Sequence, residues 1–222
     1  MLLSKELFIE NVPDIQGKKV LLRVDYNVPT DEQGQTITDD SRIRMSIQTI
    51  SYLLSKDCRI ILMSHKGRPK GKRTEKETLR IIKPALENIL TENQIKYNSV
   101  KFVDDCIGPK VKSEIDLLQP KDILILENLR FYKEEEQNDD NFAKKLAELG
   151  DLYVSDAFGA AHRAHASVEA IAKYIPHYYG FLIRNEVTNL NKILLNPVEP
   201  VVAIIGGAKV SSKIDVLNQL IK

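Results

Sequence analysis

The stretch KVLLRVD, residues Lys19–Asp25, decides the fold class of this chain. Its apolar side chains follow one another almost without interruption. Such a run is typical of a strand that is buried on both faces of a parallel sheet. The first strand of the chain is therefore predicted to lie inside an α/β domain.

Similar short apolar runs recur along the chain, and longer segments with helical spacing separate them. Arg42–Lys56 shows this spacing, with Ile43, Ile47, Ile50 and Leu54 apolar. Further strands are predicted at Arg59–Ser64, Val100–Val103, Asp122–Leu126, Leu152–Ser155 and Val201–Ile205. Further helices are predicted at Glu77–Leu90 with an interruption at Pro84, and at Lys110–Leu118, Asp140–Leu149, Ser167–Tyr174 and Leu182–Leu195. The alternation predicts right-handed βαβ units and a three-layer, Rossmann-like open parallel sheet with helices on both faces.

The segment NPVEP, residues Asn196–Pro200, predicts a linker because its two prolines prevent a continuous helix. A new strand, a Gly-Gly turn and the start of a helix follow it. We therefore expect an N-terminal domain at 1–181, an interdomain helix and linker at 182–198, and the truncated beginning of a second α/β domain at 199–222.

The charge balance argues against several classes of binding protein. Lys and Arg number 32 and Asp and Glu number 31, so the net charge of +1 does not favour nucleic acid or a membrane surface. The chain has no Trp and only 6% aromatic residues, which weakens a base-stacking role further. Any anionic ligand must therefore be bound by a local cluster of charge.

The cysteines and the apolar runs indicate a cytoplasmic protein. Cys58 and Cys106 cannot build a disulfide framework, and no Cys/His spacing predicts a zinc site. The longest apolar runs, such as Val201–Ile205, fall far short of a membrane span. Lys5 and Glu6 do not fit a secretory signal.

The residues that follow each predicted strand form the candidate site, because open α/β sheets bind ligands beyond the carboxyl ends of their strands. They include three arginines and three of the four histidines, and the guanidinium groups suit bidentate binding of phosphate. The candidates are Asp25, Asn27, His65, Arg68, Arg130, His162, Arg163 and His165. Asp25 and Asn27 lie two residues apart and face the same side, where they could hold a hydroxyl group. The pattern predicts a site for a small phosphorylated hydroxy acid.

A second phosphate-binding candidate is GGAKVSSK, residues Gly206–Lys213, after the last predicted strand. Gly206 and Gly207 would let the backbone approach a phosphate at a helix N-terminus. Lys209 and Lys213 are four residues apart and share a helix face. The segment matches neither the Walker A pattern nor the G-x-G-x-x-G dinucleotide pattern.

Six motifs together resemble those of the phosphoglycerate kinase family, in the order and spacing of that family. They are RVDYNVP (Arg23–Pro29), TDDSRIR (Thr38–Arg44), SHKGRP (Ser64–Pro69), ENLRF (Glu127–Phe131), DAFGAAHRAHAS (Asp156–Ser167) and GGAKVSSKI (Gly206–Ile214). The resemblance implies a glycolytic phosphotransferase that reversibly moves the 1-phosphate of 1,3-bisphosphoglycerate to ADP. The products are 3-phosphoglycerate and ATP, and Mg²⁺ accompanies the nucleotide.

The resemblance also implies a role for each candidate. Asp25 and Asn27 would hold the hydroxyl and carboxyl end of the glycerate in domain 1–181. The basic patch for the non-transferred phosphate would consist of His65, Arg68, Arg130 and Arg163, with His162 and His165 nearby. The catalytic residues would be Arg42, Lys209 and Lys213, and the nucleotide-binding residues in 199–222 would be Gly206, Gly207, Lys209 and Lys213. The metal-ligating acid is expected outside this chain, and the full-length enzyme is expected to be a cytoplasmic monomer.

Three departures from the family pattern stand out. The family usually has Leu at Lys66, Asn at Ser155, and Met-Glu-Lys in place of 183–185, which contains Arg184. Lys66 is expected to be solvated rather than a new ligand, and the change at 183–185 predicts a different packing of the interdomain helix.

Several charged residues are expected to play structural roles. Arg23 is predicted to form a buried or rim ion pair, and Glu127 and Asp156 to orient neighbouring arginines or cap turns. The charge block Lys133–Asp140 is predicted to be a solvated turn.

Two functions other than that of a kinase are also compatible with an α/β chain of this kind. One is a non-catalytic anion-binding or interaction module derived from this fold, against which the retention of every ligand position argues. The other is a nucleic-acid-binding α/β protein, which needs a broad basic face that this composition does not offer. Because substrate and nucleotide must be enclosed together between two domains, we expect little activity from this chain alone.

Overall fold

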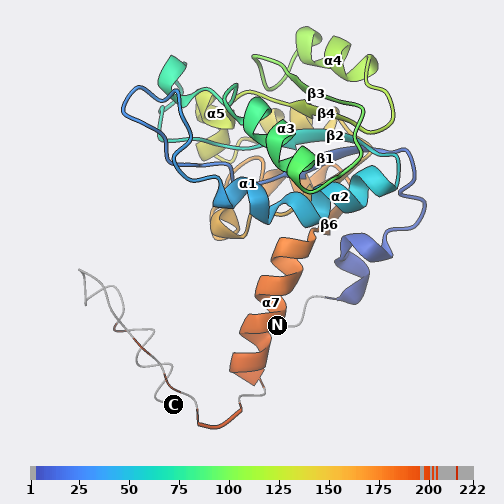
Figure 1. Cartoon of the computed structure of the whole chain (residues 1–222), viewed down its shortest axis with the longest axis vertical. Coiled ribbons are helices and arrows are strands. Elements are labelled where there is room, and N and C mark those ends of the chain that lie inside the picture. Colours follow the sequence, from blue (N-terminus) through green and yellow to red (C-terminus); the bar gives the residue numbers. More distant parts are fainter. Residues whose placement is uncertain (1–3, 196–197, 201, 203, 205–213, 215–222) are drawn as a thin grey trace. The chain divides into compact units, whose positions relative to one another are not determined.

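The computed structural model describes residues 4–195, 198–200, 202, 204 and 214 (Figure 1). The chain divides into two compact units, Met1–Val187 and Thr188–Lys222. The first unit contains the sheet and its covering helices. Most of the predicted strand Val201–Ile205, together with Gly206, Gly207, Lys209 and Lys213, lies outside the described residues.

The first unit is built on six parallel strands in the order β3-β4-β2-β1-β5-β6. The strands are β1 (Lys19–Arg23), β2 (Arg59–Met63), β3 (Ser99–Phe102), β4 (Asp122–Ile125), β5 (Leu152–Ser155) and β6 (His177–Tyr179). The first five confirm strands predicted from apolar runs. The sequence pattern does not predict β6, because HYY contains no aliphatic run.

The order of the strands changes direction at β1. From β1 the chain passes to β2 on one side and much later to β5 on the other, so β1 has parallel partners on both sides. The carboxyl ends of β1, β2, β4 and β5 therefore share one edge of the sheet. A switch of this kind is where open α/β sheets place their ligands.

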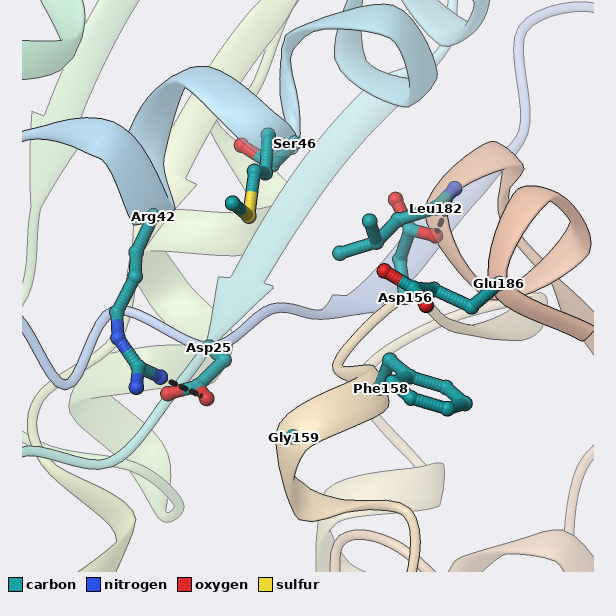
Figure 2. Close-up of a pocket in the computed structure, with 9 residues that line it drawn as sticks. Asp25, Arg42, Ser46, Asp156, Phe158, Gly159, Leu182 and Glu186 are labelled. Carbon is teal, nitrogen blue, oxygen red and sulfur yellow. Dashed lines mark hydrogen bonds and ion pairs between the residues drawn. The ribbon is translucent and has the colours of Figure 1, made fainter. Parts of the chain in front are cut away.

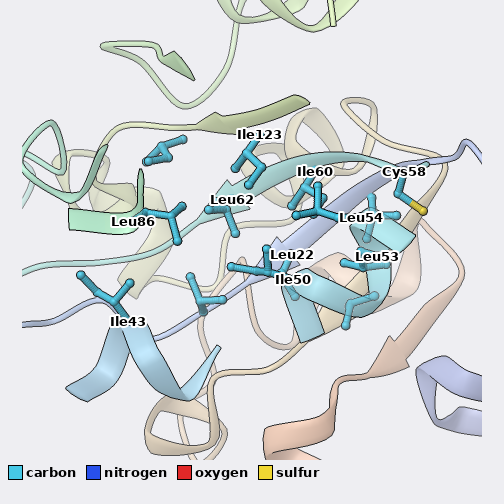
Figure 3. Close-up of a cluster of buried hydrophobic side chains, with 14 of the residues drawn as sticks. Leu22, Ile43, Ile50, Leu53, Leu54, Cys58, Ile60, Leu62, Leu86 and Ile123 are labelled. Carbon is cyan, nitrogen blue, oxygen red and sulfur yellow. The ribbon is translucent and has the colours of Figure 1, made fainter. Parts of the chain in front are cut away.

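Alternate strand side chains enter two hydrophobic cores, one on each face of the sheet. Val20 and Leu22 belong to the core with α1, α2 and α3, whereas Leu21 belongs to the core with α4 and α6 (Figure 3). The helices are α1 (Ser41–Met45), α2 (Ile47–Ser55), α3 (Ile82–Glu92), α4 (Pro109–Asp116), α5 (Lys133–Glu136), α6 (Asp140–Ala147) and α7 (Phe181–Leu195). Short 3₁₀ helices are η1 (Lys5–Leu7), η2 (Ile9–Asn11), η3 (Glu75–Glu77), η4 (Leu129–Phe131), η5 (Phe158–Ala160) and η6 (Ala170–Lys173). The predicted three-layer α/β architecture is confirmed. None of the helices in the described part of the chain has the length and apolar character needed to cross a bilayer.

The single helix predicted at Arg42–Lys56 is wrong, because the chain forms α1 and α2 with a break at Ser46. The Ser46 hydroxyl donates to the carbonyl of Ile43 at 2.8 Å and lies 2.8 Å from the hydroxyl of Tyr26. These bonds fix Ser46 in the turn between the helices. The break follows from a buried tertiary contact to Tyr26 that helical periodicity does not contain.

Two further helix predictions need correction. Pro84 does not interrupt a helix: α3 begins at Ile82, so Pro84 lies in the first turn, where no intrahelical N–H bond is lost. Ser167–Tyr174 does not form an α-helix and contains only η6. Its first residue, Ser167, uses its backbone N–H and its hydroxyl to bind Glu135, at 2.9 Å and 2.6 Å.

Two of the departures from the family pattern lie in this unit near the start of α7. Arg184 pairs with Glu10, and its guanidinium lies 4.6 Å from the ring centre of Phe181. It therefore joins the first turns of α7 to the N-terminal segment. Ser155 is buried at the end of β5, where its carbonyl accepts a hydrogen bond from the N–H of Gly180 at 2.9 Å.

Asp156 caps the N-terminus of α7, as predicted for a structural carboxylate. Its Oδ1 accepts hydrogen bonds from the N–H groups of Leu182 at 2.9 Å and Ile183 at 3.3 Å. The side chain is almost fully buried, and its Oδ2 has no hydrogen-bond partner among the described residues. Burial accordingly raises the pKa of Asp156 from its usual 3.8 to about 6.

We predict that Asp156→Asn removes a pH-dependent loss of stability. The folded carboxyl holds its proton more tightly than the unfolded one, so its contribution is present below pH 4 and is lost as the pH rises through 6. At about 1.4 kcal/mol per pKa unit, the difference in unfolding free energy between variant and parent should increase by about 3 kcal/mol from pH 4 to pH 7.5.

Urea unfolding at several pH values measures this difference. The control is Asp116→Asn, because the side chain of Asp116 is 75% exposed. A parent and an Asp156→Asn variant with parallel pH profiles would contradict the prediction.

Candidate functional site

Basic side chains surround the carboxyl end of β1. His65 follows β2 and is 4% exposed, and the Nη2 group of Arg23 donates to its Nδ1 at 3.1 Å. The pKa of His65 is lowered to about 2, first by burial and then by the charges of Arg23 and Arg130. Arg163 and His165 lower it further. Because arginine only donates, Nδ1 of His65 must accept, so His65 is a neutral imidazole that carries its proton on Nε2.

Arg130 lies on η4 and is 3% exposed. Its Nη1 donates to the carbonyl of Gly67 at 2.7 Å. Its buried Nε has no hydrogen-bond partner among the described residues: Glu136 Oε1 lies 3.3 Å away but outside hydrogen-bond geometry. Burial is also the main cause that lowers the pKa of Arg130. Glu136 therefore forms an ion pair with Arg130 but leaves Nε without a hydrogen bond, and a buried donor of this kind is a polar group that a further anion could satisfy.

The peptide at Gly67 connects two of the predicted ligands. Its N–H donates to Asn27 Oδ1 at 2.8 Å, and its carbonyl accepts from Arg130 at 2.7 Å. Gly67 adopts a φ of +62°, and an added Cβ would lie 2.1 Å from the Oε1 of Glu77. That oxygen in turn accepts from the N–H of Arg68 at 2.9 Å, while the side chain of Arg68 is exposed.

Asp25 and Arg42 form an ion pair between the end of β1 and helix α1 (Figure 2). The pair borders a cavity of about 230 Å³ that Phe158 and Leu182 also line. Gly159 lets the loop after β5 approach closely, because a Cβ there would lie 2.8 Å from Asp25 Oδ2. The side chain of Arg42 is 45% exposed and can reach a ligand at this edge.

The loop after β5 supplies the remaining candidates. Arg163 and His165 are half-buried and His162 is exposed. The Nδ1 of His165 lies 3.8 Å from the Oε1 of Glu135. Burial lowers the pKa of His165 more than Glu135 raises it. The histidine is therefore neutral at pH 7 in the absence of an anion.

The structure brings some of the predicted residues together and leaves others apart. Arg130, Arg163 and His165 lie close enough to His65 to lower its pKa. Asp25 contacts Arg42, and Asn27 and Arg130 both bind the backbone of Gly67. Arg68 and His162 lie on the surface with exposed side chains. Lys209, Lys213, Gly206 and Gly207 lie outside the described residues, so their predicted roles stay predictions.

Two side chains of this region differ from expectation. Arg23 is buried but forms no ion pair among the described residues: it donates to the hydroxyl of Ser167 at 3.0 Å, the carbonyl of Val24 and His65. Glu135 belongs to the block expected to be a solvated turn, yet it is fully buried in α5. Glu135 is one of three consecutive glutamates in the run KEEE, and the sequence of that run does not indicate which of the three is buried.

Lys66 is also buried, contrary to the expectation of a solvated side chain. It is 4% exposed, and its Nζ donates to the carbonyl of Lys76 at 2.5 Å. Asn128 binds its backbone on both sides, with Oδ1 accepting at 3.2 Å and Nδ2 donating at 2.7 Å. Burial lowers the pKa of Lys66, and nearby Glu77 opposes that effect. Lys66 therefore anchors the loop of His65 to the segment before α3 rather than adding a cation for a ligand.

The described residues do not gather three or more His, Cys, Asp or Glu side chains that could hold a metal ion. This part of the chain thus does not fit a metal-binding role. Cys58 and Cys106 are both buried free thiols. The chemistry at the sheet edge comes from guanidinium, imidazole, amide and carboxylate groups.

These features define an α/β protein with a cluster of basic side chains at the switch point of a parallel sheet. The family model described as phosphoglycerate kinase matches residues 9–222. The chain therefore belongs to the phosphoglycerate kinase family, and the resemblance inferred from the six motifs is confirmed.

Relatives and solved structures support the assignment. The chain is 49% identical to phosphoglycerate kinase of Geotalea uraniireducens and 51% identical to that of Moorella thermoacetica, covering 96% and 94% of this chain and 52% and 51% of those proteins. The solved phosphoglycerate kinase of Coxiella burnetii is similar with a TM-score of 0.82 at 34% identity, over 96% of this chain and 51% of that one. The structure of the Pyrococcus horikoshii enzyme gives 0.83 at 28% identity, over 97% and 52%. The chain spans about half the length of these relatives.

We predict that Gly67→Ala costs more stability than Gly17→Ala. Both glycines have positive φ, +62° and +69°, so both substitutions carry a backbone strain of about 1 kcal/mol. Only at Gly67 would the new Cβ displace Glu77 and break its bond to the backbone of Arg68. Gly67→Ala should therefore lose about 2–3 kcal/mol of unfolding free energy in urea titrations.

The matched variant separates the two causes, because an added Cβ at Gly17 meets no atom within 4 Å. Equal losses for the two variants would mean that the contact with Glu77 is unimportant.

Proposed function

We propose that this chain carries the glycerate-binding half of a phosphoglycerate kinase. The whole enzyme transfers a phosphoryl group reversibly from 1,3-bisphosphoglycerate to ADP and gives 3-phosphoglycerate and ATP. The observation that carries the proposal is the basic cluster of His65, Arg130, Arg163 and His165 at the switch point. In it the Nε of the buried Arg130 has no hydrogen-bond acceptor among the described residues. Family membership supports the substrate class.

The non-transferred phosphate of the substrate binds the basic patch. Guanidinium groups of Arg68, Arg130 and Arg163 neutralise its charge through charge-assisted hydrogen bonds. His65 donates from Nε2 without adding charge, since its Nδ1 is held by Arg23. His162 and His165 complete the patch from the loop after β5.

The glycerate lies between this patch and Asp25. Asp25 and Asn27 bind its hydroxyl and carboxyl end, and the ion pair with Arg42 orients Asp25. The Oδ1 of Asn27 also accepts a hydrogen bond from the N–H of Gly67, so Asn27 contacts both the ligand and the loop after β2. Arg42 then faces the transferring phosphoryl group from α1.

Transfer itself needs alignment and charge neutralisation rather than covalent help. A carboxylate nucleophile is already deprotonated and requires no general base. We propose that Arg42 acts on the phosphoryl group together with Lys209 and Lys213. Gly206 and Gly207 would let the backbone approach the nucleotide phosphates.

The remaining partners follow from the same proposal. ATP or ADP binds together with Mg²⁺. The enzyme acts as a monomer in the cytoplasm, and domain closure brings the two substrates together.

We predict that Arg130→Ala weakens the binding of 3-phosphoglycerate by roughly 10- to 150-fold. The variant loses a charged hydrogen-bond donor to phosphate, worth about 1.5–3 kcal/mol. Calorimetric titration of the 222-residue chain at low salt measures the affinity. Arg130→Lys should recover only part of the loss, since an ammonium group lacks the planar fork.

Lys144→Ala is the control for the loss of one positive charge, because Lys144 is exposed on α6. Its affinity should stay within twofold of the parent. A folded Arg130→Ala variant with parent affinity would exclude Arg130 from the site. A folded parent that does not bind 3-phosphoglycerate would contradict the proposed function and favour a non-catalytic module.

A further inference from the structure

The carboxylate of Glu135 is fully buried and lies next to Ser167 and His165, at the edge of the basic cluster. It accepts hydrogen bonds from the backbone N–H of Ser167 at 2.9 Å and from the Ser167 hydroxyl at 2.6 Å. Its own carbonyl accepts from the N–H of Ala166 at 2.9 Å. A buried carboxylate is costly unless its environment supplies hydrogen bonds or positive charge, and here both are present.

The bonds from Glu135 orient the Ser167 hydroxyl and, through it, the guanidinium of Arg23. The Ser167 hydroxyl has one proton, and the short contact to a carboxylate that can only accept takes it. The hydroxyl oxygen must then accept from Arg23 Nε, at 3.0 Å. Arg23 Nη2 donates to Nδ1 of His65 at 3.1 Å. The proton of His65 is therefore left on Nε2.

A second branch leads from Glu135 to His165, whose Nδ1 lies 3.8 Å from Oε1. The charges that face His165 are Glu135 and Glu136 of α5, Arg130 of η4 and Arg163 of its own loop. His65, after β2, also interacts with it. Two carboxylates favour the imidazolium form and two guanidinium groups oppose it. An added phosphate anion would shift this balance toward the protonated imidazole.

We propose that Glu135 is a positioning residue of the anion site, which orients the donors of Arg23 and His65 through Ser167 and stabilises the protonated form of His165 when a phosphate anion binds. The inference deepens the proposed function and rests on it for the identity of the anion. Glu135 itself does not touch the substrate in this scheme. Binding would be accompanied by uptake of a proton from solvent onto His165.

The first test needs no ligand. Glu135→Gln keeps the size of the side chain but removes its charge, and Glu134→Gln changes an exposed neighbour on the same helix. Nitrogen-15 NMR of the imidazole rings reports tautomer and titration. The parent should show His65 neutral and protonated at Nε2. In Glu135→Gln the pKa of His165 should fall, because its largest stabilising charge is gone.

The second test measures binding of 3-phosphoglycerate by calorimetry in two buffers that differ in ionisation enthalpy. The parent and Glu134→Gln should take up a fraction of a proton at pH 7. Glu135→Gln should take up at most half as much and bind about tenfold more weakly. A folded Glu135→Gln variant with parent affinity, proton uptake and histidine titration would overturn the proposal.

Ser167→Ala serves where Glu135→Gln does not fold. It removes the acceptor that orients Arg23 and keeps the carboxylate of Glu135. The guanidinium of Arg23 can then turn away from Nδ1 of His65, so the His65 tautomer should become mixed, while His165 titrates as in the parent. An unchanged His65 tautomer in this variant would refute the relay. If the parent fails to bind 3-phosphoglycerate, the proposed function fails, and the ligand-free titrations, repeated with inorganic phosphate as probe, still decide the role of Glu135.

Discussion

The buried guanidinium of Arg23 is the constraint on which this edge of the sheet depends. It extends from the central strand β1, is 1% exposed and forms no ion pair with any carboxylate of the residues that the structure describes. A buried charge must be matched by hydrogen bonds, so the loops after β2 and β5 are both held where His65 and Ser167 can accept. Glu135 then balances the charge one step away. Removing any of these partners would leave a buried charge uncompensated, which explains why segments far apart in sequence converge here.

The same constraint preorganises the basic groups at this edge of the sheet, as the proposed anion site requires. Burial, together with the charges of Arg23 and Arg130, lowers the pKa of His65 to about 2, so the imidazole stays neutral across the physiological range and acts as a donor. The cluster stays mutually repulsive until a negative charge enters it. Positive groups held in place by folding lose little freedom on binding, which is how preorganised sites gain affinity and transition-state stabilisation.

Much of the fold and of the basic cluster could be predicted from the sequence, and the features that could not be predicted share one cause. Apolar runs identify β1 to β5, and residues after those strands identify the basic cluster, because both follow from local pattern and sheet geometry. The break at Ser46, the buried Lys66 and the buried Glu135 each depend on a partner ten or more residues away. A block of charged residues is predicted to be solvated unless the fold packs it against a cationic cluster. That packing is visible only in the tertiary structure.

Arg130 shows why ligand and framework roles can coincide in one side chain. Its Nη1 donates to the carbonyl of Gly67, and the N–H of Gly67 donates to Asn27. Its Nε forms an ion pair with Glu136 but no hydrogen bond within the described part of the chain. A guanidinium has five donors in a rigid plane, so it can bind an anion without releasing the loop. An ammonium group would have to share its donors without that fixed geometry. The guanidinium of Arg130 therefore positions both the loop that carries His65 and its own Nε donor. A shift of this group would displace the loop and the donor together.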